Sequence, residues 1–148
     1  RSVQVCSKDI QKWWVGGYQV EVAQKEKMGL WHHSIAPAKH RGHLATAGQK
    51  VHIGPDGETK VTSIGTPEEL QAAYKENDWN DLTVIAKGPH FVQKINGVVF
   101  AELTDEDKQY SAASGVLALQ DHGHGTLVEF KDIRLKRNAI PSRVAPSR

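Results

Sequence analysis

The stretch GVLALQDHGHGTLVEFKDIRLK, residues 115–136, contains two runs of alternating apolar and polar residues on either side of a segment rich in Gly and His. Alternation with a period of two is typical of a β-strand that packs one face on a core. Gly123 and Gly125 supply the backbone freedom that a turn needs. The stretch therefore predicts two strands, at 115–120 and 126–136, joined by a hairpin turn.

Such a turn does not require Gln120 or His122. If the first strand continues to residue 122, Leu117 and Leu119 share one face, and Gln120 and His122 share the other. The leucines mark the face packed on a second sheet, so the Gln and the His project together from the opposite surface. They are either a pair that contacts a ligand or ordinary polar residues at a strand end, and the spacing leaves both interpretations open.

A second strand with one polar face is predicted within residues 13–24. Tyr18 and Val20 lie on one face of this strand, and Gln19 and Glu21 lie on the other. The residues that follow, 25–48, have poor periodicity and contain Gly and Pro. They predict a long loop with at most one short strand, at 29–32.

The region from 81 to 103 predicts three further strands, at 81–88, 91–95 and 98–103. Asn96-Gly97 between the last two is a strong signal for a two-residue hairpin. The segment 66–77 predicts the one helix of the chain, near residues 67–75. In this segment Thr66 can cap, Pro67 suits the first helical position and Glu69 completes a capping box. Together these elements predict an all-β fold, an antiparallel sandwich with one short helix.

The composition excludes several classes of protein. The chain has 148 residues with 19 Lys and Arg against 17 Asp and Glu, and it has no basic patch with interleaved aromatic residues, so nucleic acid is not predicted as a partner. No apolar run is long enough to insert into a membrane. A phosphate-binding loop, a dinucleotide fingerprint and a Ser-nucleophile motif are all absent. Cys6 is the only cysteine, so no internal disulfide can form.

Three blocks of sequence, in order, resemble the 3-keto-disaccharide hydrolase family. The closing signature of the family matches Gly115, Leu119, Gln120, His122, Val128, Phe130, Ile133 and Leu135. Residues 16–22 resemble its Gly-Tyr strand, and residues 79–98 resemble its Trp-Asn and Asn-Gly block. The initial Arg1-Ser2 is similar to an Arg-Ser that closes an earlier strand.

This resemblance implies a concanavalin-like jelly roll over residues 1–137. The polar composition and two prolines of residues 138–148 predict a disordered basic tail after it. The resemblance also implies that the domain is truncated at its N-terminus, because the family carries further strands before the Arg-Ser. We therefore expect missing N-terminal strands or another chain to complete the sheets. The resemblance implies a periplasmic or extracellular location, although no signal peptide is present in the sequence.

The resemblance also implies roles for individual residues. His122 and Glu21 become the catalytic candidates. Trp31 would stack on a sugar ring, unless it is a packed core residue. The other candidates for substrate binding are Arg1, Gln19, Asn80 and Gln120. Of these, Arg1 could equally be a chain end without a role, and the glutamines could be ordinary solvent-facing strand residues.

The eight histidines raise the question of a metal. Zinc sites need three or four convergent ligands, and close pairs such as His40 and His43 do not establish them. No cofactor is predicted outright, and a divalent metal stays an open alternative.

The function implied by the resemblance is cleavage of 3-keto-glycosides, with a small carbohydrate as substrate. A ketone at C3 acidifies the proton at C2, so a base can remove it and the glycosidic bond can then break by elimination, with hydrolysis as a later step. His122 and Glu21 both remain open as the base. The alternatives are a non-catalytic carbohydrate-binding jelly-roll module and a truncated domain without activity of its own.

Overall fold

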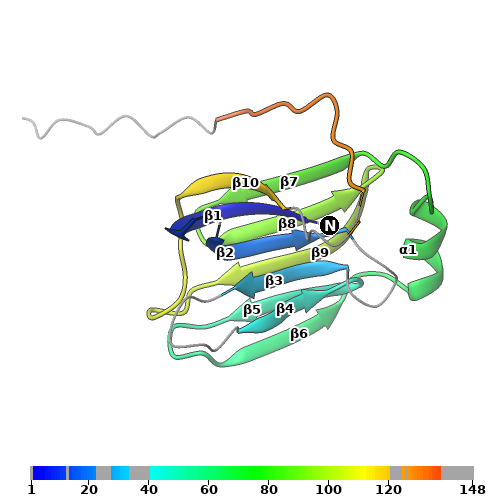
Figure 1. Ribbon diagram of the computed structural model, residues 1–148. Helices are drawn as coiled ribbons and strands as arrows, with labels where there is room; N and C mark the ends of the chain where they lie inside the picture. Colours follow the sequence, from blue (N-terminus) through cyan, green and yellow to red (C-terminus); the bar gives the residue numbers. More distant parts are fainter. Residues whose placement is uncertain are drawn as a thin grey trace, which may run out of the picture.

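The computed structural model describes residues 2–12, 14–22, 28–33, 41–120, 125 and 127–137, and within them two five-stranded sheets stack into a sandwich (Figure 1). The first sheet has the order β10-β1-β2-β3-β4, with strands Val116–Gln120, Ser2–Gln11, Trp14–Glu21, Gly29–His33 and Gly42–Thr46. The second has the order β6-β5-β9-β8-β7, with strands Thr59–Ser63, Gln49–Ile53, Val98–Asp105, His90–Ile95 and Leu82–Lys87. The predicted all-β sandwich is confirmed.

The core forms between the two sheets from residues at alternate strand positions. Tyr18, Val20 and Leu30 of the first sheet are fully buried, and they belong to the same cluster as Phe91 and Leu103 of the second. The rings of Tyr18 and Phe91 lie 4.2 Å apart between centroids. Since side chains alternate along a strand, the residues that follow Tyr18 and Val20 project from the outer face of the first sheet.

The predicted helix and hairpin are both confirmed. Helix α1, Pro67–Ala73, begins with a capping box, in which Glu69 N donates to Thr66 Oγ1 over 3.3 Å and Thr66 N donates to Glu69 Oε2 over 2.9 Å. Leu70 anchors the helix in a second core cluster. Asn96 and Gly97 both have positive φ, 51° and 83°, as a tight hairpin turn between β8 and β9 requires.

Parts of both sheets differ from the sequence prediction. Strands β1, β5 and β6 were not predicted, and β4 lies in the segment interpreted as a long loop. The sandwich is also not wholly antiparallel, because β5 and β9 pair in parallel. Strands β1 and β4 contain a register irregularity in at least one of their ladders, and such an irregularity breaks the alternation on which a strand prediction depends.

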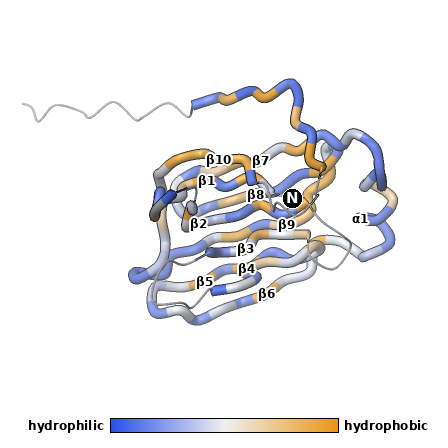
Figure 2. Tube along the Cα trace, in the orientation of Figure 1, coloured by the Kyte–Doolittle hydropathy of each residue, from blue (hydrophilic) through white to orange (hydrophobic). Residues whose placement is uncertain are grey.

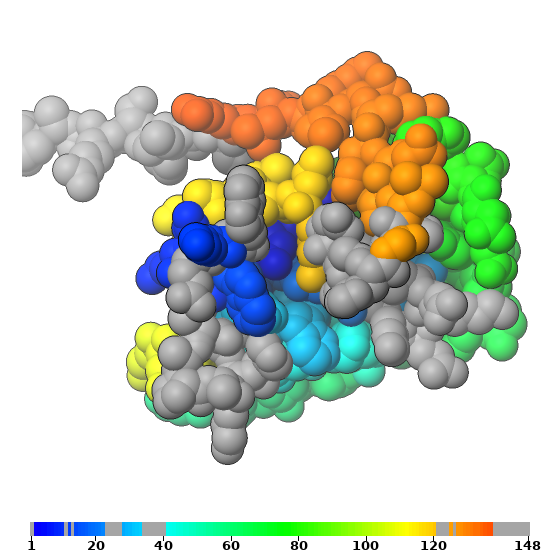
Figure 3. All heavy atoms as spheres, in the orientation of Figure 1, coloured from blue at the N-terminus to red at the C-terminus, as the bar shows by residue number. Residues whose placement is uncertain are grey.

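The predicted strand at 126–136 does not form in the described part of the chain, where residues 127–137 have no regular secondary structure. Asp132 has φ 53°, which interrupts an extended backbone. Apolar and polar residues still alternate along this segment (Figure 2), and it lies on the outside of the molecule beside β10 (Figure 3). Its apolar side chains are exposed, namely Leu127, Phe130, Ile133 and Leu135. The expected completion of the sheets by further strands stays a prediction. The predicted disorder of the tail, 138–148, concerns residues outside the described part of the chain.

A buried ion pair connects the ends of three strands. Asp105, at the end of β9, has a fully buried side chain and accepts hydrogen bonds from Tyr18 Oη at 2.6 Å and from Arg41 Nη1 at 2.6 Å. Burial alone would raise the pKa of Asp105, but the bonds from Arg41 and Tyr18 lower it below its ordinary value. His32 packs its ring edge against Tyr18, with centroids 5.0 Å apart.

His32 is expected to make the stability of the fold depend on pH. Burial, and then the charge of Arg41, lower the pKa of His32 from 6.5 to about 4. Its Nδ1 is buried without a hydrogen-bond partner among the described residues. Between pH 6.5 and about pH 4, His32 is protonated in the unfolded chain but stays neutral in the folded chain. The stability that neutral His32 contributes is therefore fully present above pH 6.5. As the pH falls from 6.5 toward 4, the free energy of unfolding decreases by at most about 1.4 kcal/mol per pH unit.

Urea unfolding at pH 4.5 and pH 7 measures this effect. We expect His32→Phe to reduce the difference in unfolding free energy between the two pH values, while His52→Gln, at an exposed position on β5, should leave it unchanged. An unaltered difference in His32→Phe would show that another group controls the acid sensitivity.

Candidate active site

The outer face of the first sheet carries a continuous set of polar side chains, which we call the polar face. The paired strands place its residues in two rows that cross the sheet. Its members are Ser2, Gln4, Ser7, Gln19, Glu21, Trp31, His43 and Gln120. A polar set of this kind, in which several members are buried, is unusual for an outer face and indicates a site.

The first row runs from Gln120 on β10, through Ser2 on β1, to Glu21 on β2 and Gly29 on β3. Ser2 Oγ donates a hydrogen bond to Gln120 Oε1. Gly29 has φ 143°, and a Cβ there would lie 2.2 Å from the carbonyl oxygen of Ala45. The backbone of β4 leaves no room for a side chain at Gly29, so β3 contributes none to this row beside Glu21.

The second row contains a chain of hydrogen bonds that ends at the Glu21 carboxylate. Ser7 Oγ donates to Gln4 Oε1 over 3.3 Å, and Gln4 Nε2 donates to Gln19 Oε1 over 3.5 Å. Gln19 Nε2 then donates to Glu21 Oε1 over 2.9 Å. Every donor in the chain points toward Glu21, so the amides hold the carboxylate in place.

A β-bulge in β1 brings Ser7 into this chain. The register of β1 shifts between Val5 and Lys8 against β2, and Cys6 has φ 48°. In a regular strand Ser7 would point to the face opposite Gln4, and the extra residue returns it to the same face. A side chain at Gly17 would collide with this arrangement, because its Cβ would lie 2.5 Å from Ser7 Oγ.

Glu21 is also fixed from the second sheet. Gln93, on β8, is fully buried and donates a hydrogen bond from Nε2 to the Glu21 carbonyl oxygen over 2.8 Å across the core. The Glu21 side chain remains 17% exposed, and that of His43 is 30% exposed. The carboxylate is therefore held firmly at its backbone and at one oxygen while it stays accessible to a ligand.

Comparison with known proteins agrees with this geometry. The family model described as a 3-keto-alpha-glucoside-1,2-lyase-like domain matches residues 2–136. The chain belongs to this family. No curated protein and no solved structure matches it.

The structure gathers four of the predicted site residues on the polar face, namely Gln19, Glu21, Trp31 and Gln120. Gln120 and Glu21 do not lie on adjacent strands, because β1 lies between β10 and β2 and contributes Ser2 and Gln4 to the face. The predicted residues Arg1 and His122 lie outside the described residues.

Asn80 does not belong to the polar face of the lyase-like domain. Its side-chain amide donates to the carbonyl oxygens of Lys75 and Asp78 over 2.7 and 3.0 Å, and its Oδ1 accepts from Lys75 N over 2.9 Å. These bonds connect the end of α1 to the start of β7, in the second sheet. These hydrogen bonds give Asn80 a structural role, and a role in ligand binding stays a prediction.

Sequence reasoning missed Ser2, Gln4, Ser7 and His43. Gln4 could have been found from the alternation of Gln4 with Val3 and Val5, if the initial segment had been interpreted as a strand. No local signal places Ser7 or His43 on this face, because a register irregularity lies beside each.

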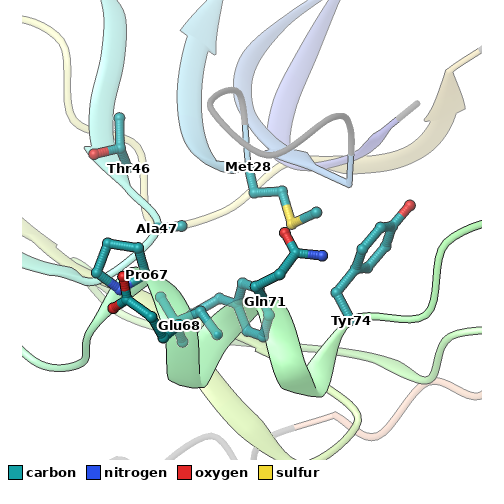
Figure 4. Close-up of a pocket in the computed structure, with 9 residues that line it drawn as sticks. Met28, Thr46, Ala47, Pro67, Glu68, Gln71 and Tyr74 are labelled. Atoms are coloured by element: carbon teal, nitrogen blue, oxygen red, sulfur yellow. The ribbon is translucent and has the colours of Figure 1, made fainter.

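The lyase-like domain also contains a cavity of about 530 Å³ between α1 and the sandwich (Figure 4). It is lined by Met28, Thr46, Ala47, Pro67, Glu68, Leu70, Gln71, Tyr74 and Phe100. None of these residues belongs to the polar face, so we treat the cavity as separate from the candidate site.

No group of three or more His, Cys, Asp or Glu residues that could hold a metal occurs among the described residues of the lyase-like domain. A search of the same residues for a helix long and apolar enough to cross a membrane finds none.

Proposed function

We propose that the polar face cleaves 3-keto-glycosides, with Glu21 as the base that removes the proton at C2 of the sugar. The proposal rests on one observation, that the Glu21 carboxylate is both held in place and partly exposed. Glu21 is partly exposed, one of its oxygens accepts the Gln19 amide, and the neighbouring position in its row is Gly29. A held, accessible carboxylate is what a base needs in order to reach a substrate carbon.

The chemistry follows from the ketone at C3. When Glu21 takes the C2 proton, the electrons of the C–H bond form a C2–C3 enolate, with negative charge on the C3 oxygen. The enolate then returns its electrons to a C1–C2 double bond, and the bond from C1 to the glycosidic oxygen breaks. The leaving oxygen takes up a proton, and water can add to C1 and C2 afterwards to complete a net hydrolysis.

The other members of the polar face suit the binding of the sugar. Gln120 is half-buried at the edge of the face, where its amide can contact hydroxyl groups, while its oxygen accepts from Ser2. Trp31 is also half-buried and lies beside Gln19 in the second row, so that its ring can pack on the C–H face of a sugar. His122 stays a second candidate for the base.

A non-catalytic carbohydrate-binding module is the alternative. It is favoured by the amide-rich composition of the face, since Gln4, Gln19 and Gln120 together with Trp31 make up half of its members. Amide groups and an aromatic ring bind sugars without any need for a base, whereas the held and partly exposed Glu21 carboxylate supplies a group that can take up a proton from carbon. This last feature leads us to prefer the enzyme.

The test is an assay of the protein with a 3-keto-disaccharide and with the same disaccharide before oxidation. We expect cleavage of the keto sugar alone, because only the ketone acidifies the C2 proton. Substrate deuterated at C2 should react more slowly if removal of this proton limits the rate. Binding of the keto sugar without cleavage would refute the enzyme and support the binding module.

A further inference from the structure

Among the described residues of the polar face, His43 on β4 is the ionisable side chain that lies beside Glu21. The pairing of β3 and β4 is irregular between Leu30 and Trp31. Leu30 lies opposite Ala45 in the core, but Trp31 lies opposite His43 rather than Leu44. The irregularity therefore places His43 beside Trp31 on the polar face and leaves Leu44 packed against the core.

Two contacts orient the imidazole of His43. Its Nε2 lies 3.9 Å from Glu21 Oε2, the carboxylate oxygen that does not accept the Gln19 amide. Its ring meets Trp31 edge to face, with centroids 4.7 Å apart and planes at 85°. The two oxygens of Glu21 thus have different neighbours, an amide donor on one side and an imidazole on the other.

We propose that His43 is the general acid of the same reaction and protonates the leaving glycosidic oxygen. This inference rests on the function proposed for Glu21. The elimination needs a proton at the leaving oxygen at the moment when the C1–O bond breaks, because a sugar alkoxide is a poor leaving group. An imidazole is suited to this task, since its unperturbed pKa lies near neutrality.

Glu21 and His43 together account for both proton transfers of the reaction. Glu21 gains the C2 proton while protonated His43 gives its Nε2 proton to the glycosidic oxygen, which departs as an alcohol. Glu21 is then protonated and His43 is neutral. Because Glu21 Oε2 and His43 Nε2 are neighbours, the proton can pass between them, directly after a small rotation or through a water, and both groups regain their starting states.

A purely structural role for His43 would come from its packing on Trp31. Two substitutions separate the roles. His43→Gln keeps polarity at the position, and His43→Phe keeps an aromatic ring against Trp31, but neither side chain can donate an acidic proton. His52→Gln serves as the matched control, since His52 also contacts a glutamate, Glu106, over 2.8 Å, but lies on β5 of the other sheet.

The experiment follows two events in D₂O by NMR for each variant. They are the exchange of the C2 proton for deuterium and the release of the leaving alcohol. Two substrates are compared, a 3-keto-disaccharide and a nitrophenyl 3-keto-glucoside, whose leaving group needs no proton. For both His43 variants we expect release from the disaccharide to fall about 10²- to 10⁴-fold, the usual contribution of general acid catalysis. C2 exchange and release of nitrophenol should stay within a few-fold of the unmodified protein.

Several outcomes would overturn the proposal. Disaccharide cleavage at the unmodified rate in either His43 variant would show that the residue donates no proton. Equal losses for both substrates would assign it a role in positioning Glu21 or Trp31. If the unmodified protein shows neither exchange nor release, the proposed function fails and this inference fails with it, whereas active protein with unaffected His43 variants refutes only the inference.

Discussion

Replacing Glu21 with glutamine is expected to abolish both C2 exchange and cleavage of a 3-keto-glycoside. Glutamine has nearly the shape of glutamate, and its side-chain oxygen can still accept the Gln19 amide, so the fold of the polar face should persist. It cannot take up a proton, however, and loss of a general base costs about 10²- to 10⁴-fold in rate. Measurement of kcat/KM and of deuterium incorporation at C2 checks this.

Glu102→Gln is the matched control for this substitution. Glu102 contacts Lys50 Nζ at 2.6 Å and lies on β9 of the second sheet, away from the polar face. Its replacement should leave the rate unchanged. Activity of Glu21→Gln within a few-fold of the unmodified protein would transfer the role of base to another residue, with His122 as the first to examine.

Removing the carboxylate of Asp105 is expected to cause a large loss of stability. The Asp105 side chain is fully buried, and the Arg41 side chain is only 12% exposed. Asp105→Ala would leave the guanidinium with only its longer contact to Asp107, at 3.8 Å, and the Tyr18 hydroxyl without its acceptor. Breaking a buried pair from one side typically costs about 3–5 kcal/mol, because the remaining charge is not compensated.

Urea unfolding at pH 7 measures this loss. Asp56→Ala is the control, because Asp56 pairs with Lys108 over 3.3 Å at a position where its side chain is 85% exposed and an ion pair contributes little. A loss below about 1 kcal/mol for Asp105→Ala would show that water or a rearranged Arg41 replaces the pair.

Much of the second sheet could be predicted from local pattern. β7, β8 and β9 alternate regularly, and the Asn96-Gly97 turn between the last two requires the positive φ that these residues adopt readily. The capping box of α1 could be predicted in the same way, because its residues lie close together in the sequence. The segment 127–137 shows the limit of such reasoning, because its alternation is as good as that of β8 and yet it has no described strand to pair with. Alternation indicates that a segment can form a strand, whereas a pairing partner decides whether it does.

The candidate site was predictable to a smaller extent. The alternation of β2 correctly placed Gln19 and Glu21 opposite Tyr18 and Val20. Recovery of His43 and Ser7 was not possible, because register irregularities place them on the polar face and these depend on contacts between strands. The local role of Asn80 was also missed, although its hydrogen-bond partners lie nearby in the sequence, and its role in ligand binding stays a prediction.

The pairing of β1 with β10 has a consequence for how the protein is made. Ser2 and Gln120 are hydrogen-bonded neighbours in the sheet although 118 positions separate them in the chain. A ribosome that adds about 5–20 residues per second has to produce nearly the whole domain before β10 can dock on β1. Until then the edge of β1 that carries Ser2 and Gln4 is not paired with β10. The Gln120 edge of the surface that we propose to be catalytic is thus among the last parts of the sandwich to assemble during translation.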